Sequence, residues 1–267
     1  MTCEKYNRET IVMRHIRLLI EYDGTSYHGW QSQKEGGTIQ DTIRAALEQI
    51  TGEQIRLTGA GRTDAGVHAL GQVAAFATSS MLLPEVIMRA MNAKLPSDIR
   101  ILRAEETGED FHPRYSARQK SYFYLISINR SHSAFLSRYC WTIPCALDPG
   151  AMEKAAQLLI GEHDFSAFMG SGCSSKHQVR TVHALAMAHL GEISFMTASM
   201  PGKYIKIRIE ANAFLRHMVR NIVGTLVEVG RSKIPVAACG EILESRDRTK
   251  AGPTAPAHGL FLERIIY

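Results

Sequence analysis

Residues 59–76, GAGRTDAGVHALGQVAAF, connect a glycine-rich segment that contains Asp64 to a long apolar run. Residues 54–61 and 66–78 have the apolar pattern of strands, so Asp64 is expected in a loop between two neighbouring strands. A loop of this composition has three interpretations: a plain turn, a nucleotide-binding loop, or the site of a carboxylate that takes part in chemistry.

The spacing of the glycines argues against nucleotide binding. Gly59 and Gly61 begin the pattern G-x-G-x-x-G, but Asp64 occupies the position of its third glycine, where a carboxylate would repel a pyrophosphate. The stretch GSGCSSK, residues 170–176, lacks the Gly-Lys-Ser/Thr ending of a phosphate-binding loop and is expected to be a serine-glycine loop. A turn or a reactive carboxylate remains, and the nearby Arg62 and the flanking glycines, which allow a substrate to approach, favour the second.

Composition limits the class of protein without naming a function. The chain has 267 residues, of which 45% are hydrophobic and 21% charged, as in a folded protein rather than a disordered one. Its net charge of +5 suits a polyanionic partner and is equally explained by solubility. Residues 1–15 lack the apolar core of a secretion signal, and no apolar run is long enough to span a membrane. We therefore expect a cytoplasmic protein, with a loose segment at residues 1–13.

The five cysteines are scattered, at positions 3, 140, 145, 173 and 239. No C-x-x-C pair or Cys/His cluster with zinc spacing occurs, and the 11 histidines form no metal-ligand motif. We therefore expect reduced thiols and no bound metal.

Hydrophobic periodicity predicts strands and helices along the whole chain. Strands are expected at residues 15–24, 54–61, 66–78, 120–128 and 203–211. Helices are expected at residues 39–50, between a Thr38 cap and a Gly52 stop, and at 84–91, 149–159 and 214–229, the last ending before Gly230. The order repeats, which predicts an α+β fold with two similar halves, residues 14–113 and 114–267, each a mainly antiparallel sheet with helices. A central cleft between the halves is the expected place for a ligand.

Two further stretches carry polar side chains in patterns that suit RNA. In FLRHMVRNIVG, residues 214–224, Arg216 and Arg220 are four residues apart and would share one helix face. That face is either simply solvated or supplies an arginine that pairs with a carboxylate or a phosphate. The stretch DFHPRYSARQKSYFY, residues 110–124, is either an amphipathic strand with core tyrosines or an RNA-binding segment with cations for phosphates and rings for bases, namely Arg114, Arg118, Lys120, Tyr115, Tyr122 and Tyr124.

Seven motifs in order resemble the tRNA pseudouridine synthase A (TruA) family. The strongest is GAGRTDAGVHALGQVAAF itself, which is similar to the catalytic signature of that family. The others are YDGTSYHGWQ, TIQD, FHPRYSA, DFSAF, ANAFLRHMVRNIVG and GLFL, which together cover most of the chain from about residue 16 to the end.

The resemblance implies an α+β enzyme that isomerises uridine to pseudouridine in the anticodon stem-loop of tRNA, at about positions 38 to 40. It implies no cofactor, a homodimer, and a positively charged cleft that binds tRNA across both subunits. It also implies that Asp64 is the nucleophile, that Tyr122 stacks on the base and that Arg220 pairs with the aspartate. Arg62 would help to extrude the target nucleotide, and Leu260 would form an apolar wall of the pocket.

Two other functions remain to be tested against the isomerase. A non-catalytic RNA-binding module would keep the cleft without the chemistry, but Asp64, Tyr122 and Arg220 are all present and argue against it. A metal-dependent RNA hydrolase would need clustered carboxylates, which the sequence does not show.

Overall fold

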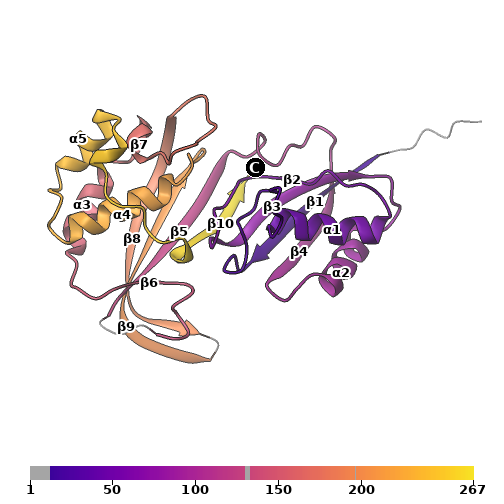
Figure 1. Ribbon diagram of the computed structural model, residues 1–267, viewed down its shortest axis with the longest axis horizontal. Coiled ribbons are helices and arrows are strands. Elements are labelled where there is room, and N and C mark those ends of the chain that lie inside the picture. The colour runs from indigo at the N-terminus through magenta and orange to yellow at the C-terminus, as the bar shows by residue number, and fades with distance from the viewer. Residues whose placement is uncertain (1–12, 130–132, 196) are drawn as a thin grey trace, which may run out of the picture.

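The computed structural model describes residues 13–129, 133–195 and 197–267, so nearly all of the segment expected to be loose lies outside the described residues. Strands and helices alternate as in an α+β protein, and that prediction of the fold class is confirmed (Figure 1). The strands are β1 (Arg14–Tyr22), β2 (Thr58–Gly59), β3 (His68–Thr78), β4 (Ile99–Thr107), β5 (Gln119–Ile128), β6 (Trp141–Ile143), β7 (Gly161–Asp164), β8 (Val179–Phe195), β9 (Ala198–Ala211) and β10 (Leu260–Ile266). The helices are α1 (Ile39–Thr51), α2 (Pro84–Lys94), α3 (Pro149–Gln157), α4 (Met218–Gly230) and α5 (Ala238–Ser245).

The strands of the described residues form one sheet, in the order β4-β1-β3-β10-β5-β9-β8-β7. β2 pairs with β3, and β6 pairs with β5. The last strand of the chain, β10, lies at the centre, where it is parallel to β3 and antiparallel to β5. β10 therefore joins the strands from the first part of the chain to those from the second part.

The predicted boundary between residues 113 and 114 falls in the connection between β4 and β5. In Figure 1, α1 and α2 lie beside the strands on one side of this boundary, and α3, α4 and α5 lie beside the strands on the other. A single sheet runs through both parts of the chain. The division into two similar halves around a central cleft therefore stays a prediction.

The core lies on the face of the sheet that carries the helices. Side chains alternate along each strand, so every second residue points to this face. The buried set includes Ile16, Leu18 and Ile20 of β1, Tyr122, Tyr124 and Ile126 of β5, Ile205, Ile207 and Ile209 of β9, and Leu260 and Leu262 of β10. These side chains form one cluster with the helices of both parts, so the two parts share a core.

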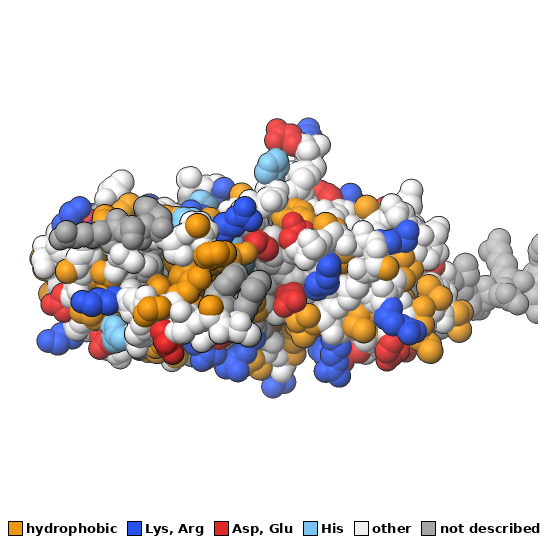
Figure 2. All heavy atoms as spheres, turned by 90° about the horizontal axis from the view of Figure 1, so that it is seen from below, with side chains coloured by type: hydrophobic (Ala, Val, Ile, Leu, Met, Phe, Trp, Pro, Cys, Tyr) orange, Lys and Arg blue, Asp and Glu red, His pale blue; other side chains and the backbone are white. Residues whose placement is uncertain are grey.

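A smaller cluster lies where β8 and β9 extend beyond the rest of the sheet. Its buried members are Leu136, Cys140 and Tyr204. Figure 2 looks onto this hairpin from below Figure 1 and shows hydrophobic side chains gathered there. The long hairpin was not predicted from the sequence, since β8 mixes polar and apolar residues without a clear alternation.

The caps predicted for the first helix are confirmed. The Thr38 side chain accepts a hydrogen bond from the Asp41 N–H, and its hydroxyl donates to the Asp41 carboxylate at 2.6 Å. Gly52 ends the helix with φ of 73°, a left-handed conformation that glycine adopts without strain. This helix forms as expected because its start and stop signals are local.

The helix predicted at residues 214–229 is wrong at both ends. α4 begins at Met218, because His217 has φ of 59° and interrupts the helical backbone, and Gly230 lies within the helix. The His217 ring packs against Gly170, where an added Cβ would lie 2.6 Å from Nδ1. Arg216 therefore precedes α4 and bonds to the Ser171 carbonyl at 2.9 Å, so it does not share a helix face with Arg220.

One predicted strand is much shorter in the structure, and one observed strand was not expected. The strand expected at residues 54–61 is reduced to the two residues of β2, because the chain beyond it turns into the loop of Asp64. β4, at the edge of the sheet, was not expected at all. Its apolar residues alternate with polar ones for only part of its length.

Candidate active site

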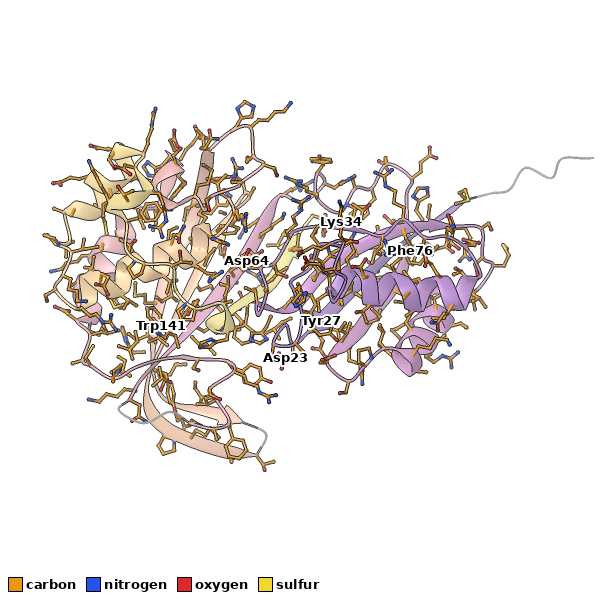
Figure 3. All side chains as sticks on the ribbon, in the orientation of Figure 1. Asp23, Tyr27, Lys34, Asp64, Phe76 and Trp141 are labelled. Carbon is orange, nitrogen blue, oxygen red and sulfur yellow. The ribbon has the colours of Figure 1, made fainter. Side chains whose placement is uncertain are left out.

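Asp64 lies in the loop between β2 and β3, near the middle of the molecule (Figure 3). Two backbone hydrogen bonds hold this loop, from Ala60 to the Val73 carbonyl at 2.8 Å and from Trp30 to the Thr63 carbonyl at 3.0 Å. The Asp64 carbonyl also accepts from the Val67 N–H at 3.1 Å, so Asp64 does begin a turn. The turn and the positioned carboxylate are therefore compatible interpretations of the same residue.

The Asp64 carboxylate forms an ion pair with Arg220 of α4. Arg220 Nη1 lies 2.9 Å from Asp64 Oδ2, and Arg220 Nε donates to the Ala255 carbonyl at 2.8 Å, which fixes the plane of the guanidinium. The Asp64 side chain is 27% exposed and that of Arg220 15%. The carboxylate is thus neither in bulk solvent nor sealed inside the protein.

His217 is a second cationic candidate beside Asp64. Its Nε2 lies 3.5 Å from Asp64 Oδ2. Burial lowers the pKa of His217 below its usual value and outweighs the opposing effect of Asp64, while Arg220 and Arg216 lower it further. His217 is therefore largely neutral at neutral pH, and Arg220 supplies the positive charge that faces the carboxylate.

Tyr122 of β5 lies close to this ion pair. It is 7% exposed, and the ring of Phe214 meets it edge-on with 5.0 Å between the centroids. A Cβ added at Gly61 would lie 3.9 Å from the Tyr122 hydroxyl, so the hydroxyl borders the loop of Asp64. Burial raises the pKa of Tyr122, and the charges of Tyr22 and Asp64 add to that effect, so the phenol stays protonated at neutral pH.

The remaining two predicted residues make no described hydrogen bond or ion pair with the carboxylate. Arg62 is exposed and donates from Nε to the Gln31 side chain at 3.0 Å. Leu260 is 5% exposed and pairs with Tyr124 in the register of β10 and β5, whereas Leu262 pairs with Tyr122. The structure therefore brings Asp64, Arg220 and Tyr122 together, and no described contact links Arg62 or Leu260 to this group.

Sequence reasoning missed two neighbours of this group, His217 and Phe214. Both lie in the segment before α4 that the sequence assigned to the helix. A helical backbone would carry them in other directions, so only the break at His217 explains their positions. A histidine three residues before Arg220 was the available signal.

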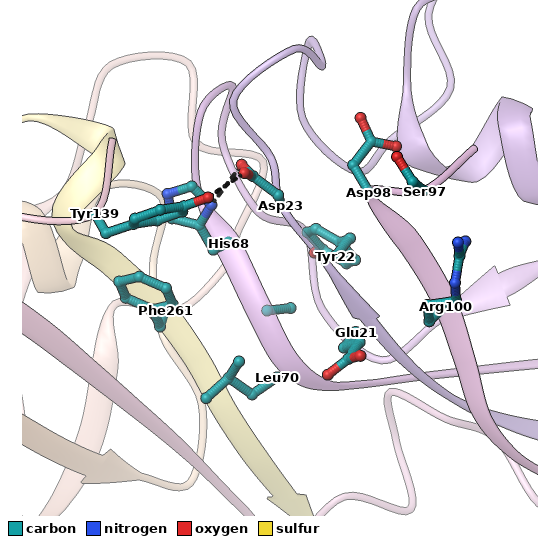
Figure 4. A pocket seen from close by; sticks show the side chains of 11 residues that line it. Glu21, Tyr22, Asp23, His68, Leu70, Ser97, Asp98, Arg100, Tyr139 and Phe261 are labelled. Atoms are coloured by element: carbon teal, nitrogen blue, oxygen red, sulfur yellow. Dashed lines mark hydrogen bonds and ion pairs between the residues drawn. The ribbon is translucent and has the colours of Figure 1, made fainter. Parts of the chain in front are cut away.

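A cavity elsewhere in the structure does not include this group. It measures about 220 Å³ and is lined by residues that include Asp23, His68, Tyr139 and Phe261 (Figure 4). The Tyr139 hydroxyl donates to Asp23 at 2.7 Å, and the His68 ring stacks on Phe261 at 4.7 Å. Phe261 precedes Leu262, which faces the core, so the cavity lies towards the opposite face of the sheet. His68 thereby anchors the start of β3.

The described residues contain neither a group of side chains that could hold a metal ion nor a helix that could cross a membrane. No three side chains of His, Cys, Asp or Glu lie together in an arrangement that could hold a metal ion in the part of the chain that the structure describes. Within the same ranges, no helix has the length and apolar character needed to cross a membrane.

Known proteins identify the family. A family profile described as tRNA pseudouridine synthase matches residues 18–116 and 155–267. A protein of Thermodesulfovibrio yellowstonii named tRNA pseudouridine synthase A is 45% identical over 255 residues, which covers 96% of this chain and 100% of that protein. A protein of Acetivibrio thermocellus with the same name is 46% identical, with the same coverage.

A solved H/ACA ribonucleoprotein bound to a substrate RNA containing 2′-deoxyuridine is also similar. It has a TM-score of 0.34 and 12% identity, and the match covers 80% of this chain and 44% of that one. The family assignment rests on the family profile and the sequence relatives, and not on this structure. The chain belongs to the tRNA pseudouridine synthase family, whose members are isomerases that act on uridine in tRNA.

Proposed function

We propose that this protein isomerises uridine to pseudouridine in the anticodon stem-loop of tRNA, at about positions 38 to 40, with Asp64 as the nucleophile. The observation that carries the proposal is the ion pair of Asp64 and Arg220 at 2.9 Å, with the carboxylate 27% exposed beside Tyr122. A carboxylate in this setting is charged, oriented and open to a substrate.

The reaction exchanges one bond of uracil for another. The bond between N1 of uracil and C1′ of ribose breaks, the ring turns, and a bond between C5 and C1′ forms, after which the C5 proton leaves. No atom is gained or lost, because the proton lost from C5 is balanced by one that N1 takes up. Asp64 can start the exchange by attack on the ribose or the base, or by removal of the proton at C2′.

Tyr122 would hold the detached uracil while it turns. Stacking of a base on an aromatic ring contributes about 1–3 kcal/mol and restrains the base without gripping one edge. Phe214 packs perpendicular to the Tyr122 ring, so a base stacked on Tyr122 would lie beside the Phe214 ring. Burial keeps the Tyr122 hydroxyl protonated before the substrate binds, and the role that we propose for Tyr122 is that of its ring.

Arg62 and Leu260 would complete the binding of the target nucleotide. A uridine in a stacked stem must be flipped out at a cost of a few kcal/mol. The Arg62 side chain is exposed and makes a single described contact, to Gln31, which it can leave to fill the vacated space or to hold a phosphate. Leu260 would form an apolar wall on the side of Tyr124.

The setting of the protein is also part of the proposal. Cys140, Cys145, Cys173 and Cys239 are all free thiols, as expected for an enzyme of the reducing cytoplasm. We propose that it acts there as a homodimer that binds tRNA across both subunits and needs no cofactor.

Tritium release tests the role of Asp64. The substrate is a tRNA transcript labelled at C5 of uridine, and a second transcript with cytidine at positions 38 to 40 serves as the substrate control. Asp64→Asn removes the charge but keeps the size of the side chain, so it should bind tRNA like the wild type and release at least about a thousandfold less tritium.

Asp148→Asn is the matched control variant. Asp148 caps α3, and asparagine caps a helix about as well as aspartate, so this protein should keep full activity. If Asp64→Asn releases tritium as fast as Asp148→Asn does, Asp64 has no part in the mechanism. If the wild type binds tRNA but releases no tritium, the protein is instead an RNA-binding module without this chemistry.

A further inference from the structure

The segment between β4 and β5 presents an aromatic ring to solvent in a fixed position. Tyr115 is 77% exposed, the His112 ring lies 4.4 Å from it, and the Arg114 guanidinium lies 5.7 Å from its centroid. His112 Nδ1 accepts hydrogen bonds from the N–H groups of Arg114 and Tyr115, at 3.1 Å and 3.3 Å. The turn is therefore held by its own contacts, and the Tyr115 ring is available to a partner.

A group of positive charges lies beside this turn. Lys120 is 8% exposed, and its Nζ donates to the Ala60 carbonyl at 2.7 Å. No carboxylate of the described residues forms an ion pair with it. Burial, followed by the like charges of Arg114 and Arg180, lowers the pKa of Lys120 to about 8. Uncompensated cations in a low-dielectric setting are costly, so an anion bound here would be stabilised.

Arg180, at the start of β8, shows the same lack of a counter-charge. Its guanidinium donates to the His177 carbonyl at 3.0 Å and to the Ser175 hydroxyl at 2.8 Å, but its buried Nε has no partner among the described residues. Burial, and after it the charge of Arg114, lowers the pKa of Arg180. Arg17, Arg208 and Arg231, by contrast, pair with the carboxylates of Glu105, Glu263 and Glu228.

This group borders the candidate active site. A Cβ added at Gly61 would lie 3.6 Å from Lys120 Nζ and 3.9 Å from the Tyr122 hydroxyl. Lys120 and Tyr122 are two residues apart on β5 and point to the same face of the sheet. RNA bound at Asp64 would therefore have its neighbouring backbone close to these cations.

We propose that Arg114 and Tyr115 form a second RNA-binding subsite, in which the Arg114 guanidinium binds a backbone phosphate of tRNA and the Tyr115 ring stacks on an adjacent base. The proposal rests on the proposed function, since tRNA is the ligand. A guanidinium matches the geometry of a phosphate, and bases of a loop are free to leave their own stack. The charges of Lys120 and Arg180 act on the same region and add to its positive potential without contacting the ligand.

Binding of tRNA tests the subsite, measured in the inactive Asp64→Asn background over a series of salt concentrations. Arg114→Gln is the main variant, because the Arg114 side chain is exposed and makes no described hydrogen bond or ion pair, so its loss should not disturb folding. We expect about tenfold weaker binding, and a salt slope lower by about 1 if one phosphate contact is lost. Arg89→Gln, on the exposed side of α2, is the matched control.

Tyr115 gives an independent test of stacking. Tyr115→Ala should weaken binding by roughly 5- to 100-fold with an unchanged salt slope, and Tyr115→Phe, which keeps the ring, should bind like the unsubstituted protein. With Asp64 restored, Arg114→Gln and Tyr115→Ala should raise KM and leave kcat within about twofold, because the subsite holds tRNA rather than the reacting atoms, whereas Tyr115→Phe and Arg89→Gln should keep the wild-type KM.

Two results would overturn the subsite. The first is that Arg114→Gln and Tyr115→Ala bind tRNA as tightly as Arg89→Gln does. The second is that these two variants lose kcat while their affinity for tRNA is unchanged, which would indicate a disturbed active-site loop. Either result, found with a wild type that releases tritium from tRNA, rejects the subsite alone. A wild type that releases none rejects the proposed function instead.

Discussion

At the scale of single residues, the buried ammonium of Lys120 makes stability depend on pH. Its pKa is 10.5 in the unfolded chain and about 8 in the folded protein, so between these values the unfolded chain binds more protons and stability rises with pH. Lys120→Met lacks this effect. Between pH 7 and pH 10 the wild type should therefore gain about 2–3 kcal/mol in free energy of unfolding relative to the variant, as measured by urea denaturation.

A second lysine supplies the control for this measurement. Lys94 is exposed at the end of α2, and Lys94→Met should keep a constant difference from the wild type over the same pH range. A constant difference for Lys120→Met as well would mean that the Lys120 ammonium is solvated. Lys120 would then not add a buried positive charge to the proposed subsite.

At the scale of elements, Gly224 of α4 shows how a helix is seated against a loop. Alanine normally stabilises a helix interior by about 0.5–1 kcal/mol relative to glycine. A Cβ at Gly224, however, would lie 1.7 Å from the Pro253 carbonyl oxygen, which is backbone. Gly224→Ala should cost about 3 kcal/mol and also lower kcat, because the displaced loop carries the Ala255 carbonyl that holds Arg220.

Gly240 of α5 is the matched control at this scale. A Cβ there has nothing within 4 Å, so Gly240→Ala should raise the free energy of unfolding by about 0.5–1 kcal/mol and leave kcat unchanged. If Gly224→Ala and Gly240→Ala have equal effects on denaturation and on tritium release, α4 does not depend on the close contact between Gly224 and the Pro253 carbonyl.

At the scale of the whole molecule, one sheet and one main core predict one cooperative unfolding transition. The two tryptophans report on different parts, since Trp30 is buried before α1 and Trp141 lies on β6. In Trp30→Phe and in Trp141→Phe, the fluorescence of the remaining tryptophan should change at the same urea concentration as the circular dichroism. A fluorescence transition separated from the dichroism in either variant would instead mean that residues 14–113 and 114–267 unfold as independent domains.

Local signals account for the parts of the fold that were predicted correctly. Thr38, Asp41 and Gly52 determine the limits of α1 because caps act over one helical turn. The alternation of Ile205, Ile207 and Ile209 determines β9 in the same way, because a strand with one buried face needs that period. His217 shows the limit of such signals, since its left-handed backbone depends on packing against Gly170, more than forty positions away.

The sequence by itself determined the α+β class, the loop that carries Asp64 and the family of the chain, because each depends on short motifs in a fixed order. Only the tertiary structure decided that β10 lies between β3 and β5, and that the chain leaves the helical conformation at His217, so that Arg216 bonds to the Ser171 carbonyl. The physical reason is range: propensity and capping act between near neighbours, whereas strand order and the pairing of Asp64 with Arg220, 156 positions apart, result from burying one shared core.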